Sequence, residues 1–382
     1  MTNPLLQLKT HGQSVWYDNI DRAQLLSGLF QRLIDEDGIT GTTANPTIFE
    51  QSMGRGTVYD EQIQQLMNEG KSTKEIYEAL AMTDIRTVAD LLRPIYDETE
   101  GQDGFVSLEV SPDLAQDTEG TLSEVRRFWK TVDCPNLLVK IPATPAGIPA
   151  IRQALSEGIN INITLIFSLE NYRQVVDAYL SALEERLAAG KAIRHIASVA
   201  SFFVSRVDVL VDTLLEDKIK TMTDSVEQQK LKALEGKAAI ANARLVYQEF
   251  KHLFSTPRFE TLKHHSAHVQ RPLWASTSTK NPAYRDVLYA EELIGPDTVD
   301  TMPLTTIENF RDHGNVRRSI EDNILQARAE LATLEEVGIP YDQVTRQLQK
   351  EGVQKFADSF HTLFTSIEDK QKTLQGKKVS RG

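Results

Sequence analysis

Short apolar runs alternate with longer amphipathic segments along most of the chain. Residues 22–37 place Leu25, Leu29 and Leu33 at helical spacing, and Gly38 follows where a helix usually ends. Runs rich in β-branched and aromatic residues recur between such segments, as expected of strands. These runs are residues 14–20, 39–45, 104–111, 136–141, 160–168, 195–205, 271–277 and 297–303. The pattern predicts eight short strands, each separated from the next by at least one helix.

Strands that alternate with helices run parallel, because a helical crossover returns the chain to the same end of the sheet. Eight such units predict a closed (β/α)8 TIM barrel, and a doubly wound open sheet is the alternative. We expect residues 1–315 to form the barrel and residues 316–382 to form extra C-terminal helices packed on it. The basic tail, residues 370–382, is expected to fray.

Composition narrows the function classes. The formal net charge is −12, which argues against nucleic acid or an anionic membrane as a partner. Cys134 is the only cysteine and excludes an internal disulfide. No apolar stretch approaches membrane-spanning length, and the N-terminal residues do not resemble a secretory signal. We therefore expect a cytoplasmic protein.

The strand predicted at residues 136–141 carries a single charge, Lys140, and lies between Pro135 and Pro142. Desolvation disfavours an ammonium, so burial favours the neutral amine. A neutral amine beside an apolar pocket is the nucleophile that forms Schiff bases with carbonyl substrates. The alternative is a structural lysine that reaches solvent or pairs with a core carboxylate.

Polar residues occur on the other predicted strands as well, and this favours the catalytic interpretation of Lys140. Barrel enzymes build their sites from the C-terminal ends of several strands. A packed core would instead have to satisfy all of these polar groups in one layer. The residues are Asp18, Thr43, Asn45, Glu109, Asn162, Thr164, Ser201 and Ser276.

Five segments in order resemble the transaldolase family, in its longer bacterial and actinobacterial-type branch. They are residues 42–49, 106–110, 136–144, 158–168 and 271–282. The resemblance implies a barrel of the class I aldolase type that needs no metal or organic cofactor. It also implies the pentose phosphate pathway reaction: transfer of a dihydroxyacetone unit from sedoheptulose 7-phosphate to glyceraldehyde 3-phosphate, giving erythrose 4-phosphate and fructose 6-phosphate. Sugar phosphates would be the partners, and the chain would be a monomer or homodimer.

The resemblance also assigns roles to individual residues. Lys140 matches the Schiff-base lysine of the family, and Glu109 and Asp18 match its acid–base carboxylates. Thr164 matches the threonine that holds a catalytic water together with the glutamate. The residues that match substrate-binding positions or line the pocket are Thr43, Asn45, Asn162, Ser201, Phe203, Arg206, Ser276 and Lys280.

The phosphate-binding part departs from the family pattern. Arg206 matches the phosphate-binding arginine and Ser276 a second phosphate ligand. A basic residue usually stands two positions after that serine, but here Ser278 stands there and Lys280 comes two residues later. Asp208 and Asp212 follow Arg206 at helical spacing and are expected either to orient it or to lie on an exposed helix face.

Two other functions compete with transfer. A fructose-6-phosphate aldolase-like enzyme has the same lysine and releases free dihydroxyacetone, but that sister family usually has glutamine in place of Glu109 and tyrosine in place of Phe203. An inactive barrel that serves as a scaffold is the other alternative, and it would be expected to have lost part of the polar set. Tyr284 and Arg285 are expected on a rim helix over residues 282–292.

Overall fold

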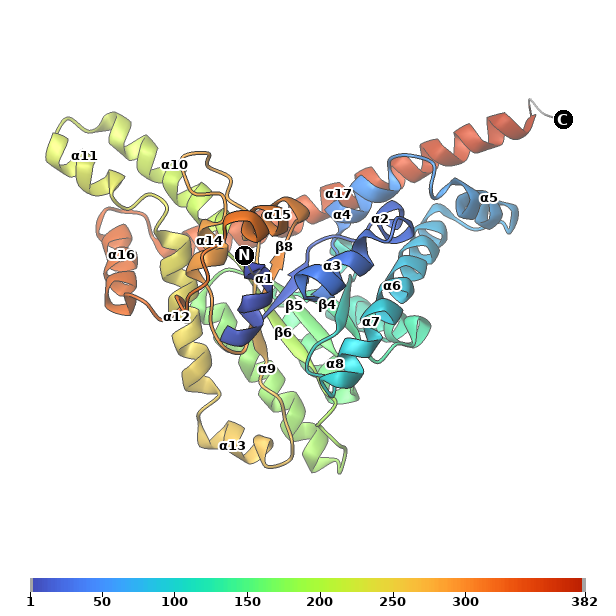
Figure 1. Cartoon of the computed structure of the whole chain (residues 1–382), viewed down its shortest axis with the longest axis horizontal. Helices are drawn as coiled ribbons and strands as arrows, with labels where there is room; N and C mark the ends of the chain where they lie inside the picture. The colour runs from blue at the N-terminus through green and yellow to red at the C-terminus, as the bar shows by residue number, and fades with distance from the viewer. Residues whose placement is uncertain (1–2, 380–382) are drawn as a thin grey trace.

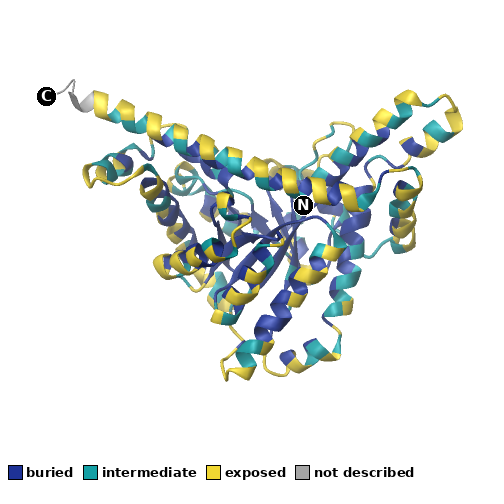
Figure 2. Ribbon diagram, turned by 180° about the vertical axis from the view of Figure 1, so that it is seen from behind, coloured by how far each residue is buried: buried dark blue, intermediate teal, exposed yellow. Residues whose placement is uncertain are grey.

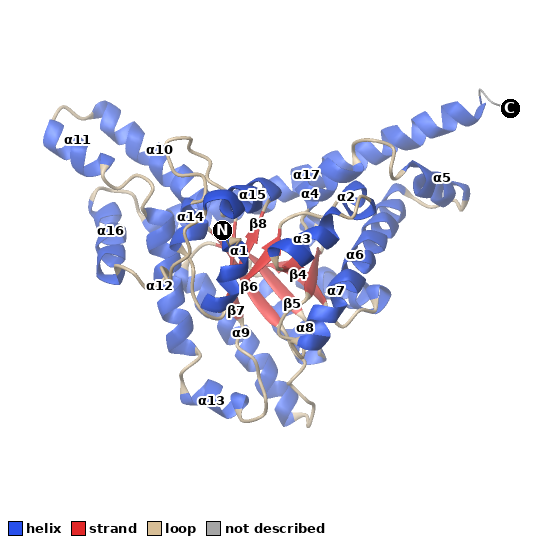
Figure 3. Cartoon of the chain, viewed as in Figure 1, coloured by secondary structure: helices blue, strands red, loops and turns tan. Residues whose placement is uncertain are grey.

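The computed structural model describes residues 3–379, with side chains through residue 376. Eight parallel strands form a closed barrel in chain order, which confirms the predicted TIM barrel and excludes the open sheet. Figures 1 and 3 show the strands at the centre of a layer of helices. The strands are β1 Gln13–Tyr17, β2 Ile39–Thr42, β3 Phe105–Glu109, β4 Leu137–Pro142, β5 Ile161–Ile166, β6 Ser198–Phe203, β7 Arg271–Ala275 and β8 Thr298–Met302.

The helices follow the predicted order, with local differences. The segment 22–37 is two helices, because Gly28 takes a left-handed conformation (φ 73°) between them. Ser72 caps a long helix through a reciprocal bond pattern with Glu75. The bounds are α1 Pro4–Leu8, α2 Arg22–Leu26, α3 Leu29–Asp37, α4 Pro46–Met53, α5 Asp60–Asn68, α6 Thr73–Glu98, α7 Thr118–Val132, α8 Gly147–Glu157, α9 Leu169–Ala188, α10 Ser205–Thr221, α11 Ser225–Lys232, α12 Ala238–Leu253, α13 Pro257–Lys263, α14 Leu288–Glu292, α15 Leu304–His313, α16 Ile324–Glu336 and α17 Tyr341–Val379.

One helix expected near the C-terminal end of the barrel is shorter than predicted. Only Leu288–Glu292 is helical, so Tyr284 and Arg285 lie in the turns before α14 rather than on a rim helix. The tyrosine hydroxyl donates to Asp212 at 2.7 Å, and this side-chain contact shapes the segment instead of helical hydrogen bonds. The prediction of an amphipathic helix over 282–292 is therefore wrong for its first half.

An aromatic side chain, Trp16, packs inside the barrel toward the N-terminal ends of the strands. The Trp16 indole is fully buried, and its Nε1 donates to Asp103 at 2.8 Å. A Cβ atom on Gly41 would lie 2.5 Å from the indole, closer than atoms can approach. Glycine at position 41 therefore makes room for this ring on the neighbouring strand. Figure 2 shows the buried barrel interior inside helices whose outer faces are exposed.

The longest helix, α17, lies across the C-terminal end of the barrel, where it contacts α4, α6, α10 and β5 (Figure 1). Aromatic contacts hold it there: the Tyr77 ring of α6 lies 5.4 Å from Phe360 and 5.6 Å from Phe364. The tail expected to fray instead continues the helix to Val379, and Lys370 donates to the Gly56 carbonyl. Residues 380–382 of that tail lie outside the described residues. The division of the chain at residue 315 stays a prediction.

None of the described helices combines the length and apolar character that a membrane-spanning segment needs.

Candidate active site

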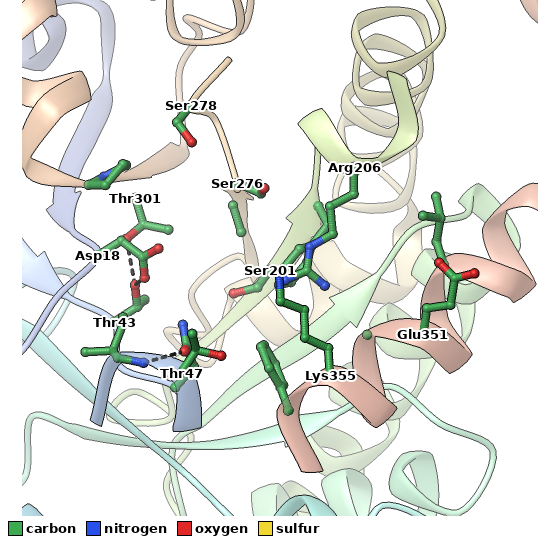
Figure 4. Close-up of a pocket in the computed structure, with 18 of the residues that line it drawn as sticks. Asp18, Thr43, Thr47, Ser201, Arg206, Ser276, Ser278, Thr301, Glu351 and Lys355 are labelled. Carbon is green, nitrogen blue, oxygen red and sulfur yellow. Dashed lines mark hydrogen bonds between the residues drawn. The ribbon is translucent and has the colours of Figure 1, made fainter. Parts of the chain in front are cut away.

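A cavity of about 750 Å³ opens where the strands end and α10 and α17 pass over the barrel (Figure 4). Most residues singled out from the sequence line it. They are Asp18, Thr43, Asn45, Lys140, Ser201, Phe203, Arg206, Ser276 and Lys280. Glu109, Asn162 and Thr164 do not line the cavity and are buried on β3 and β5. The barrel thus gathers residues from seven strands and their following loops at one end.

Lys140 lies on β4 between two polar neighbours. Strand register pairs it with Glu109 on one side and with Asn162 on the other. Its Nζ is 3.3 Å from Oε2 of Glu109, at ion-pair distance but not at a hydrogen-bonding angle. The same nitrogen donates to the Ala44 carbonyl at 3.3 Å. Lys140 is the one lysine buried among the described residues, and it still reaches the cavity.

Asp18 follows β1 and lines the cavity, and one of its carboxylate oxygens accepts a hydrogen bond. The Thr43 hydroxyl donates to Oδ1 of Asp18 at 2.7 Å. Thr301 lies 2.7 Å from the same hydroxyl and must donate to it, since the Thr43 hydrogen is already used. Burial raises the pKa of Asp18, against the Thr43 hydrogen bond and the charge of Lys140. A carboxyl group whose pKa is raised in this way takes up a proton more readily than an ordinary carboxylate.

Glu109 and Thr164 each carry a buried oxygen without a hydrogen-bond partner among the described residues, namely Oε2 and Oγ1. Thr164 pairs in register with Pro142, two residues beyond Lys140. Burial raises the pKa of Glu109, and the charge of Lys140 opposes that change. Buried polar oxygens normally have partners, so this pair offers hydrogen-bonding capacity beside Lys140.

Asn162 is occupied by protein contacts. Its amide nitrogen donates to Ser107 at 3.0 Å, and its oxygen accepts from Ser201 at 2.6 Å. Because the side chain is fully buried, its visible effect is to orient the Ser201 hydroxyl, which does reach the cavity. Asn45 differs: its oxygen caps α4 by accepting from the Ile48 amide at 3.1 Å, and the rest of its side chain lines the cavity.

One wall of the cavity is cationic. Arg206 is the second residue of α10, and its guanidinium lies 4.9 Å from the Phe203 ring centre and 5.8 Å from that of Phe356. Burial lowers the pKa of this guanidinium. Burial likewise lowers the pKa of Lys280, and the charges of Lys355 and Arg206 lower it further. Such a wall can bind an anion.

The loop after β7 is fixed in an unusual conformation. Ser276 has a left-handed backbone (φ 59°), which is rare for a residue other than glycine. Its carbonyl accepts from the Ser205 amide at 3.0 Å, and the two serine hydroxyls lie 2.9 Å apart. Thr277 donates to Asp300 at 2.8 Å, and Lys280 donates to Ser278 at 2.7 Å. Such strain is maintained where surrounding contacts over-determine the backbone, often at functional sites.

Asp208 and Asp212 neither contact Arg206 nor lie on an exposed face, so both expectations for them are wrong. Asp208 accepts from the Ala239 amide at 2.7 Å and from the Tyr289 hydroxyl at 2.8 Å. Asp212 accepts from the Gly236 amide at 2.9 Å and from Tyr284. Both carboxylates are buried, because α12 and the segment leading into α14 pack on this face of α10. They therefore tie that segment to α10.

Sequence reasoning missed the contribution of α17. Five of its residues line the cavity, and they recur at a spacing of three or four, as one face of a helix does. No strand-end signal marks them, because they lie in a segment outside the eight strands. The one available signal in the sequence was Gly352 in the middle of this helix, because a glycine there allows close approach to another segment. The residues are Leu348, Glu351, Gly352, Lys355 and Phe356.

Comparison with known proteins agrees with this geometry. The family described as "Transaldolase/Fructose-6-phosphate aldolase" matches residues 15–367. A protein named "Transaldolase" from Trichodesmium erythraeum is 46% identical over 98% of this chain and 99% of its own length. Another protein of that name, from Parafrankia sp., is 48% identical over 97% of this chain and 98% of its own length. A third relative, "Transaldolase 2" from Streptomyces avermitilis, is 45% identical over 96% of this chain and 97% of its own length. With its closed barrel and buried strand lysine, the chain belongs to the transaldolase/fructose-6-phosphate aldolase family.

Proposed function

We propose that the protein is a transaldolase that transfers a dihydroxyacetone unit from sedoheptulose 7-phosphate to glyceraldehyde 3-phosphate through a Schiff base on Lys140. The observation that carries this proposal is a buried lysine at the cavity, 3.3 Å from Glu109, in a barrel of the matching family. The names of the full-length relatives support the same reaction. Erythrose 4-phosphate and fructose 6-phosphate are the products.

The first step is attack of the neutral Lys140 amine on the ketose carbonyl carbon. The resulting carbinolamine loses water to give an iminium, which can accept an electron pair from a breaking carbon–carbon bond. Proton transfers in this step fall to Glu109, through a water that Thr164 helps to hold. This assignment is supported by Oγ1 of Thr164, which has no hydrogen-bond partner among the described residues, and by Oε2 of Glu109, which lies 3.3 Å from Lys140 and can accept a further hydrogen bond from a water.

The second step is cleavage of the bond between C3 and C4. Asp18 removes the proton of the C4 hydroxyl, the electron pair of the breaking bond passes into the iminium, and the aldose phosphate leaves. The remaining three carbons stay on Lys140 as an enamine, which then attacks the carbonyl of the acceptor aldehyde. The raised pKa of Asp18 suits a group that takes up a proton and returns it in the reverse sense.

Substrate hydroxyls and phosphate account for the remaining residues. Asn45, Thr43 and Ser201 present hydrogen-bonding groups at the cavity, and Asn162 orients Ser201. Arg206, Ser276 and Lys280 form the proposed phosphate site. Because the formal net charge is −12, affinity for an anionic substrate must come from such local cations. We expect the enzyme to act in the cytoplasm as a monomer or homodimer.

Two features favour transfer over release of free dihydroxyacetone. A glutamate stands at position 109, and an apolar ring at position 203 lines the cavity. An apolar ring supplies no proton to the enamine, so the bound intermediate waits for an aldehyde. An inactive scaffold is disfavoured, because the polar strand-end set is complete and the cavity is open to solvent.

Borohydride reduction in the presence of fructose 6-phosphate tests the mechanism. We expect a covalent three-carbon adduct on Lys140, located by peptide mapping, and formation of sedoheptulose 7-phosphate when erythrose 4-phosphate is supplied. Lys140→Arg should fold normally but neither trap substrate nor turn over, because a guanidinium stays protonated and cannot attack a carbonyl. A label on another lysine, or none, would refute the Schiff-base proposal.

A further inference from the structure

Three cations line the cavity without forming an ion pair with a carboxylate of the described residues. Arg206 and Lys355 form no hydrogen bond or ion pair with any described residue, and Lys280 bonds only to the Ser278 hydroxyl. Many other basic residues of the chain pair with Asp or Glu, as Arg258 does with Asp177 and Glu184. The three cations stand out because they share one cavity in an acidic protein.

The cations act on one another through space. The charges of Lys355 and Arg206 both lower the pKa of Lys280, so the three lie within electrostatic reach. Figure 4 shows the Lys355 side chain extending from α17 toward Arg206. Asp18 acts on Arg206 and Lys280 in the opposite sense, but no ion pair joins it to any of the three cations, so their mutual repulsion is only partly offset. An arrangement of this kind is favourable when an anion occupies the space between the charges.

The position of Lys355 is set by how α17 sits on the barrel. The Gln349 amide nitrogen donates to the carbonyls of Ala143 at 3.0 Å and Leu165 at 3.1 Å. One turn later, Gly352 brings the helix backbone close: a Cβ there would lie 2.8 Å from Leu165 and 3.4 Å from the Arg206 guanidinium. These contacts place the next turn of α17, with Lys355, at the cavity where α17 packs against α10.

A local helix pair does not account for Lys355. Glu351 precedes it by one turn, where an i,i+4 ion pair is common. In this structure the Glu351 carboxylate accepts instead from Gln347 at 2.7 Å, and Glu351 and Lys355 form no ion pair. Lys355 is an exposed residue that lines the cavity and has no acidic partner among the described residues.

We propose that Lys355 binds the phosphate group of the sugar phosphate, as a third cationic ligand beside Arg206 and Lys280. This inference rests on the proposed function and assigns to α17 a part in substrate selection. The ammonium adds charge from α17, whereas Arg206 comes from α10. The same site serves the donor ketose phosphate and the acceptor aldose phosphate, since both carry phosphate at the end far from the reacting carbonyl.

The main test compares Lys355→Gln with Lys355→Arg and with Lys350→Gln, an exposed lysine on α17 that does not line the cavity. We expect Lys355→Gln to raise KM for fructose 6-phosphate and for erythrose 4-phosphate roughly 3- to 10-fold, with little change in kcat. Lys355→Arg should retain most of the affinity, and Lys350→Gln should match the wild type. Borohydride trapping of unphosphorylated dihydroxyacetone should be the same in all four proteins.

A binding measurement without turnover completes the test. Inorganic phosphate should raise the melting temperature of the wild type more than that of Lys355→Gln, with chloride at equal ionic strength as the control. Without phosphate, Lys355→Gln should melt at the same or a higher temperature, because one repelling charge is gone. Unchanged KM values and an unchanged phosphate shift would overturn the inference, as would equal losses with dihydroxyacetone. Failure of the wild type to trap dihydroxyacetone would instead count against the Schiff-base proposal.

Discussion

Phe203 lines the cavity, and its ring packs against Arg206 of the proposed phosphate site. The ring centre lies 4.9 Å from the Arg206 guanidinium and 5.3 Å from the Phe167 ring. It is buried at the end of β6, two residues after Ser201 on the same side of the strand. Phe203 therefore presents an apolar surface in the cavity that Lys140 also lines, and we propose that it keeps proton donors away from the enamine.

Phe203→Tyr should therefore shift the enzyme from transfer toward aldol cleavage. A phenolic hydroxyl near the enamine offers a proton donor, and a positioned donor typically contributes 10²–10⁴-fold to proton transfer. We expect release of free dihydroxyacetone from fructose 6-phosphate to rise by roughly tenfold or more, and transfer to erythrose 4-phosphate to fall. Both rates and the melting temperature should be measured on the same preparation.

The competing explanation is that Phe203 only packs the core. A buried hydroxyl without a partner would then cost about 1–3 kcal/mol of stability. In that case both activities would decline together and the melting temperature would drop. Such a result would exclude a role for this ring in keeping the enamine from being protonated.

At the scale of elements, one side chain joins α17 to the barrel at the site. The Gln349 amide shares its two hydrogens among the carbonyls of Ala143 and Leu165 and the side-chain oxygen of Asn171. Leu165 lies at an irregularity of β5 and has a left-handed backbone (φ 58°). This departure from regular strand geometry interrupts the pairing with β6 and leaves the Leu165 carbonyl free for α17.

Gln349→Met should loosen α17 while the barrel stays folded. Removal of the amide leaves a buried strand carbonyl without its partner, at a cost of about 1–3 kcal/mol. We expect KM for phosphorylated substrates to rise several-fold and amide hydrogen exchange to speed up in α17. Gln354→Met on the exposed face of the same helix is the matched control and should behave as the wild type, since Gln354 bonds only to Asp358 and does not line the cavity. Unchanged exchange in α17 would show that the aromatic contacts with Tyr77 suffice to seat the helix.

At the scale of the whole molecule, buried carboxyl groups make stability depend on pH. Burial raises the pKa of Asp300 to about 7 and that of Asp208 to about 7. Asp300 is fully buried on β8, and its Oδ2 has no hydrogen-bond partner among the described residues. Between about pH 4 and pH 7 the folded state holds these protons more tightly than the unfolded state. Stability should therefore fall as pH rises through that window.

Asp300→Asn should remove part of this pH dependence. The amide cannot ionise, and its oxygen can still accept from Thr277. We expect the free energy of unfolding of the variant to decline less than that of the wild type between pH 5 and pH 8, as measured by urea denaturation. The advantage of the variant should be largest at pH 8. A parallel pair of pH profiles would mean that Asp300 keeps its proton in both states or in neither.

The residues from Asp18 to Ser276 could be placed at one site from the sequence, because a parallel barrel brings the C-terminal ends of all its strands together. Hydrophobic periodicity was sufficient to predict the eight strands and their order, and strand ends carry the side chains that face the cavity. Residues such as Lys140 and Glu109 are close because of strand pairing alone. Local pattern and topology therefore determine this part of the site.

Features that depend on packing between segments far apart in the chain were decided by the tertiary structure alone. A helix pattern does not say which face it will bury or against what, so the sequence suggested for Asp208 and Asp212 either a contact with Arg206 or an exposed face, whereas α12 and the segment before α14 cover them. The same holds for α17, whose approach to β5 depends on Gly352 and Gln349 meeting Leu165. The sequence thus determined the barrel and the buried position of Lys140 on a strand, whereas only long-range packing brought Lys355 to the cavity that Arg206 also lines.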